Sequence, residues 1–333
     1  MAFRMLVYHD MPEFALEELA RHGIAVVRGT EPTEAVICRE IADCDALVAF
    51  EQPENGFNAR IMDAAPRLKL IARRGVGYET VDTVYAEQKG IYVTNTPAIN
   101  SRTVAEAVIL LMLECSRNAQ KISERFRRER AEYQMFTSDV SARGFELTGC
   151  TLGIIGCGNI GRHVAQMANE GFHMRVLGYD AYAGALPACI ERVDSTERIW
   201  SEADFVSLHM PSTPETKQSV GMEQFQKMKP GAYLINTSRG DIVRERELIA
   251  ALETGVIRGA GLDVYSKEPI PQSAYPLFGM ERVVLTPHNA SFTRESLYNA
   301  FRSVVRSVTQ VADGEEPTFR VNRPAHPRME VKK

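Results

Sequence analysis

Three polar residues in the second half of the chain have side chains suited to acid–base chemistry on a carbonyl group. Each follows a short apolar run typical of a buried strand; they are Arg239, Glu268 and His288. An arginine can hold a carboxylate through two parallel hydrogen bonds and polarise a neighbouring ketone. A histidine can protonate the developing alkoxide, and an acid can fix its tautomer and favour its protonated form. The set suits the reduction of a ketone to an alcohol.

Each of these residues by itself has a simpler explanation. An arginine after a strand is most often a surface cation, and a glutamate before proline is most often a loop acid. His288 could be a satisfied core histidine, since the chain has 7 histidines in all. The three gain weight together because ligands meet side chains at the carboxyl ends of strands in open α/β sheets. We therefore predict that all three lie at strand ends of one sheet.

A glycine-rich loop stands before these residues in the chain. The sequence Gly156-Cys157-Gly158-Asn159-Ile160-Gly161 lies between an apolar strand pattern at 151–155 and a helical pattern at 162–168. A second strand pattern, 174–180, ends in Asp180. This context is the dinucleotide-binding fingerprint, in which glycines let the backbone approach a pyrophosphate at a helix N-terminus. The alternative is a glycine turn in an ordinary βαβ unit, where Cys157 is a small residue that fits.

Asp180 also indicates which nicotinamide cofactor to expect. An acid at the end of the second strand accepts hydrogen bonds from the adenosine ribose and repels a 2′-phosphate. From Ala181 to Ile190 there is no Arg or Lys that could bind that phosphate. We predict that the cofactor is NAD.

Composition excludes several other classes of protein. The chain has 333 residues, 44% hydrophobic and 25% charged, with a net charge of −4, so we expect no nucleic-acid partner. No apolar run reaches the ~18 residues that span a bilayer, so we expect no membrane partner. The 6 cysteines lack metal spacing and no signal peptide is apparent, which favours a cytoplasmic protein with reduced thiols. The basic cluster Arg125–Arg130 is interpreted as a solvated helix face.

Short apolar strands alternate with helical patterns along most of the chain. This order predicts an α/β protein with parallel sheets covered on both faces. The fingerprint begins only near residue 150, after a complete small α/β domain. We therefore predict two doubly wound parallel-sheet domains. A Rossmann NAD-binding domain, residues 101–289, is inserted into a flavodoxin-like substrate-binding domain made of residues 1–100 and 290–333, with the ligand between them.

Two further expectations concern the helices and the end of the chain. The pattern from Ser101 to Gln120 predicts one long helix, and a last helix is expected over 294–312. The segment from Arg320 onward, with its prolines and basic residues, is expected to be loosely ordered.

Taken together, the motifs resemble those of the D-isomer-specific 2-hydroxyacid dehydrogenase family. They occur in family order and span nearly the whole chain. The matching segments are Gly75-Val76-Gly77-Tyr78 with Val81-Asp82, Val104-Ala105-Glu106, the Gly156–Gly161 loop, Leu208-His209-Met210-Pro211 with residues 213–216, Asn236-Thr237-Ser238-Arg239-Gly240, Asp263-Val264 with Glu268-Pro269, and Thr286-Pro287-His288. Asn289 and Phe292 depart from the small or aliphatic residues usual in the family, which bears on substrate range.

The resemblance implies an enzyme that interconverts a 2-oxo acid and a D-2-hydroxy acid with NAD. Arg239, Glu268 and His288 would be its catalytic residues, and Arg239 would also bind substrate. The backbone amides of Val76 and Gly77 would hold the substrate carboxylate. The expected cofactor-binding residues are Gly156, Gly158, Asn159, Ile160, Gly161, Asp180, His209, Pro211, Thr216, Thr237 and Asp263, the last facing the nicotinamide amide.

Other readings within and outside the family stay open. Arg73, with Arg74 beside it, resembles a phosphate-binding arginine of 3-phosphoglycerate dehydrogenase, here without a regulatory domain; the simpler explanation is a pair of surface or domain-contact cations. Formate dehydrogenase is disfavoured because it has Gln where this chain has Glu268. A corepressor-like NAD-sensing protein is a different class, which turnover would distinguish.

The resemblance also implies a homodimer. The apolar helix face of Val104, Val108, Leu111 and Met112 is a candidate seam, although packing within the chain could use the same residues.

Overall fold

The computed structural model describes residues 2–50, 53–129, 143–270 and 275–329. The chain divides into two compact units, which we describe separately. Unit 1 is Met1–Asn100 with Thr293–Lys333, and unit 2 is Ser101–Phe292. The second crossing between units therefore falls three residues after the 289/290 boundary expected from the sequence.

Unit 1 is built on a sheet of 5 parallel strands in the order β2-β1-β3-β4-β5. The strands are β1 (Phe3–Val7), β2 (Ile24–Arg28), β3 (Ala46–Ala49), β4 (Leu70–Arg73) and β5 (Tyr92–Thr94). The helices are α1 (Glu13–Arg21), α2 (Glu34–Glu40), α3 (Ala59–Asp63), α4 (Thr83–Gln88) and, from the far end of the chain, α12 (Arg294–Ala312).

Alternate residues of each strand in unit 1 pack on opposite faces of the sheet. On β1, Met5 packs in the cluster that α1 and α12 cover, whereas Leu6 packs in the cluster that α2, α3 and α4 cover. This is the two-residue period of a strand buried on both sides. Helix α12 contributes Phe301 and Val308 to the first cluster, so the end of the chain completes the core that its beginning starts.

The segment after α12 is more ordered than the sequence suggested. Arg320 forms an antiparallel bridge with Thr94, the last residue of β5. The side chain of Asn322 accepts a hydrogen bond from the amide of Val93 at 2.8 Å and donates to the carbonyl of Ile91 at 2.9 Å. The prediction of a loose tail is wrong for 320–329, because the free edge of β5 supplies backbone partners that composition does not reveal.

Unit 2 contains a sheet of 7 parallel strands in the order β12-β11-β10-β9-β6-β7-β8. The strands are β6 (Thr151–Ile155), β7 (Arg175–Tyr179), β8 (Glu191–Arg192), β9 (Phe205–Leu208), β10 (Tyr233–Asn236), β11 (Gly259–Leu262) and β12 (Val283–Leu285). The helices are α5 (Ser101–Arg117), α6 (Ala119–Glu129), α8 (Asn159–Gln166), η2 (Met167–Gly171), α9 (Glu197–Glu202), α10 (Met222–Lys227), η3 (Gly240–Ile242), α11 (Glu245–Glu253) and η4 (Pro276–Gly279).

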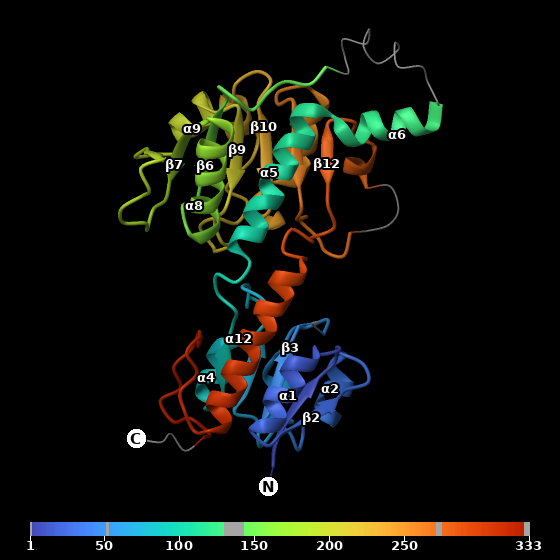
Figure 1. The fold of residues 1–333 in the computed structure, drawn as a ribbon, viewed down its shortest axis with the longest axis vertical. Helices are drawn as coiled ribbons and strands as arrows, with labels where there is room; N and C mark the ends of the chain where they lie inside the picture. The colour runs from blue at the N-terminus through green and yellow to red at the C-terminus, as the bar shows by residue number, and fades with distance from the viewer. Residues whose placement is uncertain (1, 51–52, 130–142, 271–274, 330–333) are drawn as a thin grey trace. The chain divides into compact units, whose positions relative to one another are not determined.

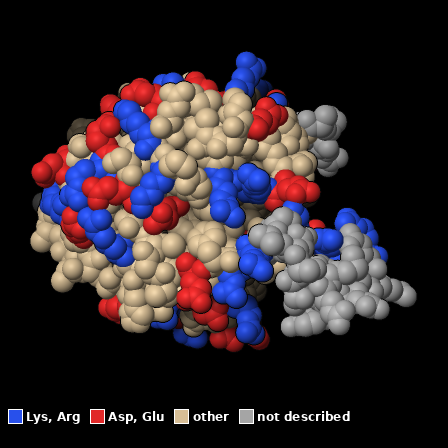
Figure 2. Space-filling model, turned by 90° about the horizontal axis from the view of Figure 1, so that it is seen from above, with Lys and Arg blue, Asp and Glu red and all other residues tan. Residues whose placement is uncertain are grey.

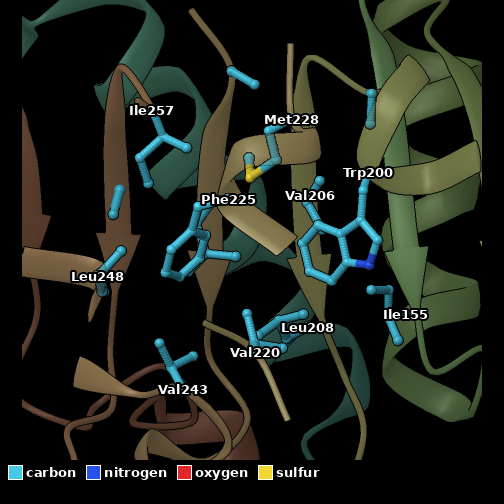
Figure 3. Close-up of a cluster of buried hydrophobic side chains, with 14 of the residues drawn as sticks. Ile155, Trp200, Val206, Leu208, Val220, Phe225, Met228, Val243, Leu248 and Ile257 are labelled. Carbon is cyan, nitrogen blue, oxygen red and sulfur yellow. The ribbon is translucent and has the colours of Figure 1, made fainter. Parts of the chain in front are cut away.

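Helices cover both faces of the unit 2 sheet. On one face α9, α10 and α11 enclose a cluster that includes Trp200, Phe225 and Leu248, part of which is shown in Figure 3. On the other face α5 and α8 pack together against the sheet.

The candidate dimer seam on α5 is used within the chain instead. Val104, Val108, Leu111 and Met112 are all buried inside unit 2, with at most 5% of each exposed. Leu111 packs directly against the β11 backbone at Gly261, so this face is not available to a second copy. Leu110, on the outer face of the same helix, is 53% exposed.

The predicted helix 101–120 is broken near its end. Asn118 has a φ of 52°, so α5 ends at Arg117 and α6 begins at Ala119 and leaves in a new direction (Figure 1). Asparagine is one of the few residues that tolerate this left-handed conformation. The carboxylate of Glu114 accepts the amide of Gln120 at 2.9 Å, which satisfies an amide in the first turn of α6. Of the basic cluster, Arg127 and Arg128 are exposed on α6, and Arg130 lies outside the described residues.

These two units confirm the predicted fold class, α/β with two parallel-sheet domains. No helix in the described ranges has the length and apolar character needed to cross a membrane. Basic and acidic side chains are interspersed over the face of the molecule that Figure 2 shows. Arg175 and Arg198 form a network of ion pairs with Glu191 and Glu202.

Candidate active site

The three candidate catalytic residues follow three adjacent strands of unit 2. Arg239 comes after β10, Glu268 after β11 and His288 after β12, and these strands are neighbours in the sheet. Because all three strands are parallel, their carboxyl ends lie at one edge of the sheet. The structure therefore brings together residues that are up to 49 positions apart in the sequence.

His288 and Glu268 form a close pair. Nδ1 of His288 lies 2.5 Å from Oε2 of Glu268, and Oε1 of Glu268 accepts the amide of Tyr265 at 3.0 Å. The hydrogen bond to Glu268 raises the pKa of His288, although partial burial acts in the opposite direction. Burial alone raises the pKa of Glu268, but the bond and charge of His288, with the Tyr265 amide, lower it overall. The pair thus favours an ionised acid beside a protonated imidazole.

Arg239 is held by a turn that closes on β10. The buried side chain of Asn236 accepts the Ser238 amide at 3.0 Å and donates to the Arg239 carbonyl at 3.0 Å. Arg239 itself donates from Nη1 to the Ser238 carbonyl at 2.8 Å. Its positive charge acts to lower the pKa of both Glu268 and His288, so the three groups are close enough to interact. Asn236 belongs to the family motif at 236–240, but its role in positioning Arg239 was not predicted from the sequence.

Asp263 holds the loop that carries His288. It is 1% exposed, and Oδ1 accepts the Thr286 hydroxyl at 2.5 Å and the Asn289 amide at 2.9 Å. Its Oδ2 accepts the Ala290 amide at 2.9 Å. Three hydrogen bonds to a carboxylate fix the backbone on both sides of His288. A carboxylate can accept about four hydrogen bonds, so one acceptor position is left for the predicted contact with the nicotinamide amide.

Tyr265 joins all three strand-end loops, a role that sequence reasoning missed. Its hydroxyl donates to the Thr286 carbonyl at 2.7 Å, and that carbonyl also accepts the His288 amide at 3.0 Å. A Cβ at Gly240, next to Arg239, would lie 1.9 Å from the Tyr265 carbonyl oxygen, so only glycine allows this approach. The available signal was a tyrosine three residues after the end of β11, whose hydroxyl needs a partner when buried.

The glycine loop has the geometry that a pyrophosphate needs. Gly156 has a φ of 99°, and a Cβ there would lie 2.7 Å from the His209 carbonyl carbon. A Cβ at Gly161 would lie 2.3 Å from the Gly156 oxygen, whereas one at Gly158 would meet no described atom within 4 Å. Gly158 therefore faces open space at the start of α8, whose first turn has no side-chain cap. Uncapped amides at a helix N-terminus can bind an anion, with Asn159 and Ile160 in that first turn.

Asp180 is already engaged by its own loop. Its Oδ2 accepts the Cys157 amide, and its Oδ1 accepts the amides of Tyr182 and Ala183, each at 2.8 Å. These bonds fix the carboxylate at the end of β7 beside the glycine loop. The Cys157 thiol is buried, and burial first, then the charge of Asp180, raises its pKa to about 12, which fits its interpretation as a small packing residue.

Two arginines from outside the 181–190 segment reach its backbone, which the sequence search did not predict. Arg162 donates to the Ala185 carbonyl at 3.1 Å, and Arg192 donates to the Gly184 carbonyl at 2.7 Å. Their positive charges therefore lie beside the segment that follows Asp180.

The other candidate cofactor residues lie in two loops of the same unit. The Thr216 hydroxyl donates to the Pro211 carbonyl at 2.6 Å and accepts the Thr213 amide at 2.8 Å, so it shapes its own loop. Nε2 of His209 lies 2.8 Å from the Ser207 hydroxyl, and burial lowers the pKa of His209 to about 4, so it is neutral. Among the described residues, the buried Oγ1 of Thr237 has no hydrogen-bond partner.

The candidate substrate residues of unit 1 lie after β4. The carbonyls of Gly75, Val76 and Gly77 accept the Thr96 amide, the Asn95 side chain and Nε of Arg73, respectively. Among the described residues, neither the Val76 nor the Gly77 amide donates a hydrogen bond. The turn thus presents amides to an incoming anion.

Arg73 also donates from Nη1 to the carbonyls of Ala49 at 3.0 Å and Phe50 at 2.7 Å. With the bond to Gly77, its guanidinium clamps the end of β3 to the glycine turn. This contact pattern favours a structural role over the predicted phosphate contact.

Unit 2 is therefore a doubly wound α/β domain with a histidine–glutamate pair and an arginine after the carboxyl ends of three adjacent strands. The model of the D-isomer specific 2-hydroxyacid dehydrogenase NAD-binding domain matches residues 109–290. A glyoxylate reductase of Korarchaeum cryptofilum is 37% identical over 96% of this chain and 96% of its own. The chain belongs to the D-isomer specific 2-hydroxyacid dehydrogenase family, whose members are oxidoreductases that use a nicotinamide cofactor.

Two further relatives show the breadth of the similarity. A D-3-phosphoglycerate dehydrogenase of Methanocaldococcus jannaschii is 34% identical over 99% of this chain, which spans only 61% of that relative. The structure of an NADPH-dependent glyoxylate/hydroxypyruvate reductase from Sinorhizobium meliloti superposes with a TM-score of 0.84 at 27% identity, covering 96% of this chain and 97% of that one. The relatives thus differ in their named substrates and include a user of NADPH.

Proposed function

We propose that this protein reduces a 2-oxo acid to a D-2-hydroxy acid with NADH, and catalyses the reverse reaction with NAD. The observation that carries the proposal is the 2.5 Å pair of His288 and Glu268 beside Arg239, at the ligand edge of the nucleotide-binding sheet. The nicotinamide supplies or takes up the hydride. Every other chemical task falls to side chains of the chain.

His288 is the general acid of reduction. Its Nε2 gives a proton to the alkoxide oxygen as the hydride reaches the carbonyl carbon, and in oxidation the same nitrogen takes the proton back. Glu268 holds the Nδ1 proton, which fixes the tautomer, and it stabilises the imidazolium. Arg239 binds the substrate carboxylate and polarises the adjacent carbonyl. The amides of Val76 and Gly77 bind the same carboxylate.

The test is a panel of 2-oxo acids assayed by loss of NADH absorbance. The panel contains pyruvate, glyoxylate, hydroxypyruvate, 3-phosphohydroxypyruvate and bulky aliphatic and aromatic oxo acids. His288→Ala is expected to lower kcat by about 10² or more while NADH still binds, because the residues proposed to hold the pyrophosphate lie elsewhere. Binding of NADH without turnover of any oxo acid would instead support a corepressor-like binding protein.

A 3-phosphoglycerate dehydrogenase is the second candidate, because relatives with that name match almost the full chain at 33–34% identity. The contacts of Arg73 argue against its predicted role in that reaction. Efficient reduction of 3-phosphohydroxypyruvate in the same panel would support this candidate.

NAD is the cofactor we propose, on the strength of Asp180. A carboxylate at the end of β7 repels a 2′-phosphate. The positive charges of Arg162 and Arg192 would attract a 2′-phosphate, but both side chains donate to backbone carbonyls of the loop. Asp180→Ala should narrow the preference for NADH over NADPH, and equal use of both cofactors by the wild type would contradict the assignment.

We also propose a homodimer. Since the first candidate seam is buried, the exposed apolar side chains of Leu110 on α5 and Phe126 on α6, each 53% exposed, are the better candidates for contact with a second copy. Sedimentation at micromolar concentration tests this, and a monomer would reject it.

A further inference from the structure

Two residues outside the strand ends contact the loop that carries Glu268. They are Glu245, in the first turn of α11, and Tyr275, directly before η4. Neither belongs to the motifs predicted from the sequence, and neither has a task in the proposed mechanism. Both lie in unit 2, so they belong to the same compact body as Glu268 and His288.

The loop after β11 gives consecutive backbone amides to two different carboxylates. The Tyr265 amide donates to Oε1 of Glu268 at 3.0 Å. The next amide, that of Ser266, donates to Oε2 of Glu245, also at 3.0 Å. Since each peptide group is planar, fixing one amide restricts the rotation of its neighbour. Glu245 therefore restrains the backbone from which Glu268 takes its own hydrogen bond.

The hydroxyl of Tyr275 holds the Glu245 carboxylate in this position. It donates to the same Oε2 atom at 2.7 Å. The Tyr275 ring packs edge-on against Tyr265, with ring centres 6.0 Å apart, and against Phe278, with ring centres 5.3 Å apart. Burial, followed by the hydrogen bond to Glu245, raises the pKa of Tyr275, so its hydroxyl keeps the proton that it donates.

Tyr265 extends these contacts to the other member of the acid–base pair. Its ring packs on Tyr275, and its hydroxyl donates to the Thr286 carbonyl at 2.7 Å. That carbonyl also accepts the His288 amide at 3.0 Å. The contacts of Tyr275 thus reach the loop of Glu268 on one side and the loop of His288 on the other.

The pair needs such support because both of its side chains are partly exposed. Solvent competes for an exposed ion pair, and a glutamate side chain is among the most costly to immobilise. A close contact between Glu268 and His288 therefore depends on the two backbones that present them.

Several other charged and titratable groups act on the pair. Burial and the mutual hydrogen bond are the main influences on the pKa values of its two members. The charge of Arg239 also acts on both, and that of Asp263 acts on His288. Burial is the main cause that raises the pKa of Tyr265 and of Tyr275, so both tyrosines are neutral. Replacing Tyr275 by Phe consequently changes no charge beside the pair.

We propose that Glu245 and Tyr275 are positioning residues, which fix loop 265–268 so that Glu268 stays in contact with Nδ1 of His288. The inference rests on the proposed function for its effect on turnover. The simpler role for Glu245 is that of an acid in the first turn of α11, where it stabilises the positive end of the helix dipole. Glu247 shares that turn but accepts the Met222 amide of α10, so it provides a matched control.

The experiment follows the titration of the His288 imidazole by NMR in the full chain, labelled on histidine. His288→Ala identifies the signal. Tyr275→Phe should lower the midpoint of this titration, because Glu268 is then held less firmly beside the ring. Glu245→Ala should lower it further, and Glu245→Gln should lie between Glu245→Ala and the wild type, since an amide oxygen still accepts one hydrogen bond.

Steady-state kinetics with the best oxo acid of the panel give the second readout. Tyr275→Phe should lower kcat for reduction by about three- to tenfold, because a small misplacement of an acid–base group is costly. The alkaline limb of its pH–rate profile should move to lower pH, while the Kd for NADH stays the same. Glu247→Gln should lower the melting temperature as Glu245→Gln does, but should leave kcat and the His288 midpoint unchanged.

The outcomes separate this inference from the proposed function. If the variants of Glu245 and Tyr275 lower only the melting temperature, both residues are structural and the inference fails. If Glu247→Gln moves the His288 midpoint as far as Glu245→Gln does, the charge at the helix end is responsible and the inference fails. If Glu245→Ala does not fold, Tyr275→Phe decides. If the wild type turns over no 2-oxo acid, the proposed function fails, while the NMR titration still decides whether these residues hold the pair.

Discussion

Glu268→Gln offers the sharpest test of the acid–base pair, because it changes one charge and keeps the shape of the side chain. The carboxylate lies 2.5 Å from Nδ1 of His288 and raises the pKa of that imidazole. Without the negative charge the protonated form loses its partner, so the pKa of His288 should fall. Reduction needs protonated His288, so the alkaline limb of the pH–rate profile for reduction should move to lower pH. Oxidation needs the neutral ring, so its acid limb should move in the same direction.

The exposure of the pair sets the size of the expected shift. An opposite charge in hydrogen-bond contact moves a pKa by ~1–3 units. The side chains of His288 and Glu268 are 50% and 34% exposed, so solvent screens the interaction and the lower end of that range applies. We therefore expect a fall of about tenfold in the rate of reduction on the alkaline limb, at the low end of that range. At acid pH His288 is protonated in both the wild type and Glu268→Gln, so the loss of activity should be mild.

The assay is the pH dependence of kcat and kcat/KM for NADH oxidation with the best oxo acid of the panel. Glu253→Gln, an exposed acid at the end of α11 in the same unit, controls for the loss of one charge and should leave both limbs in place. A rate reduced by one factor at every pH would refute the reasoning. Glu268 would then be a loop acid, and His288 would take its proton affinity from another group.

Three other substitutions test the supports of the site, and one tests the fold. Arg239→Lys should raise KM and lower kcat together in steady-state kinetics, because an ammonium cannot make the two-pronged contact. Tyr265→Phe removes the 2.7 Å bond to the Thr286 carbonyl and should lower kcat while the Kd for NADH, measured by fluorescence, stays the same. Arg73→Met should lower the free energy of unfolding by about 1–3 kcal/mol in urea titrations, since it leaves carbonyl acceptors without donors. Asn118→Gly should raise it slightly, by up to about 1 kcal/mol, because glycine accepts a φ of 52° without strain.

Local pattern in the sequence was enough to predict the elements that carry the site. Each strand of unit 2 that bears a candidate residue is a short apolar run, and buried parallel strands have that signature regardless of their partners. The glycine loop could be predicted for the same reason. Gly156 allows a turn, Gly158 leaves open space and Gly161 allows a close backbone contact, all within one βα unit. Such constraints act over a few residues and so leave a mark in the sequence.

Features that depend on which segments become neighbours in the fold could not be predicted from the sequence. The ordered tail after Arg320 was missed for this reason, whereas the break at Asn118 was missed because asparagine tolerates a left-handed conformation without requiring it. The tail is ordered because β5 offers it an edge, and no property of residues 320–329 announces that edge. Val104 and its neighbours on α5 have the pattern of any apolar helix face, and only the packing decided that the face is internal.

The same distinction holds inside the candidate site. Residue type together with a position after an apolar strand pattern marked Arg239, Glu268 and His288, because few side chains can bind a carboxylate or move a proton near neutral pH. Tertiary structure alone decided that Asp263 and Tyr265 fix the loop of His288, and that Arg73 is a clamp while Arg74 joins an aromatic cluster. Adjacent arginines look alike in a sequence. Their roles differ because Arg73 ends β4 whereas Arg74 begins the following turn, and what each side chain then meets is set by segments distant in the sequence.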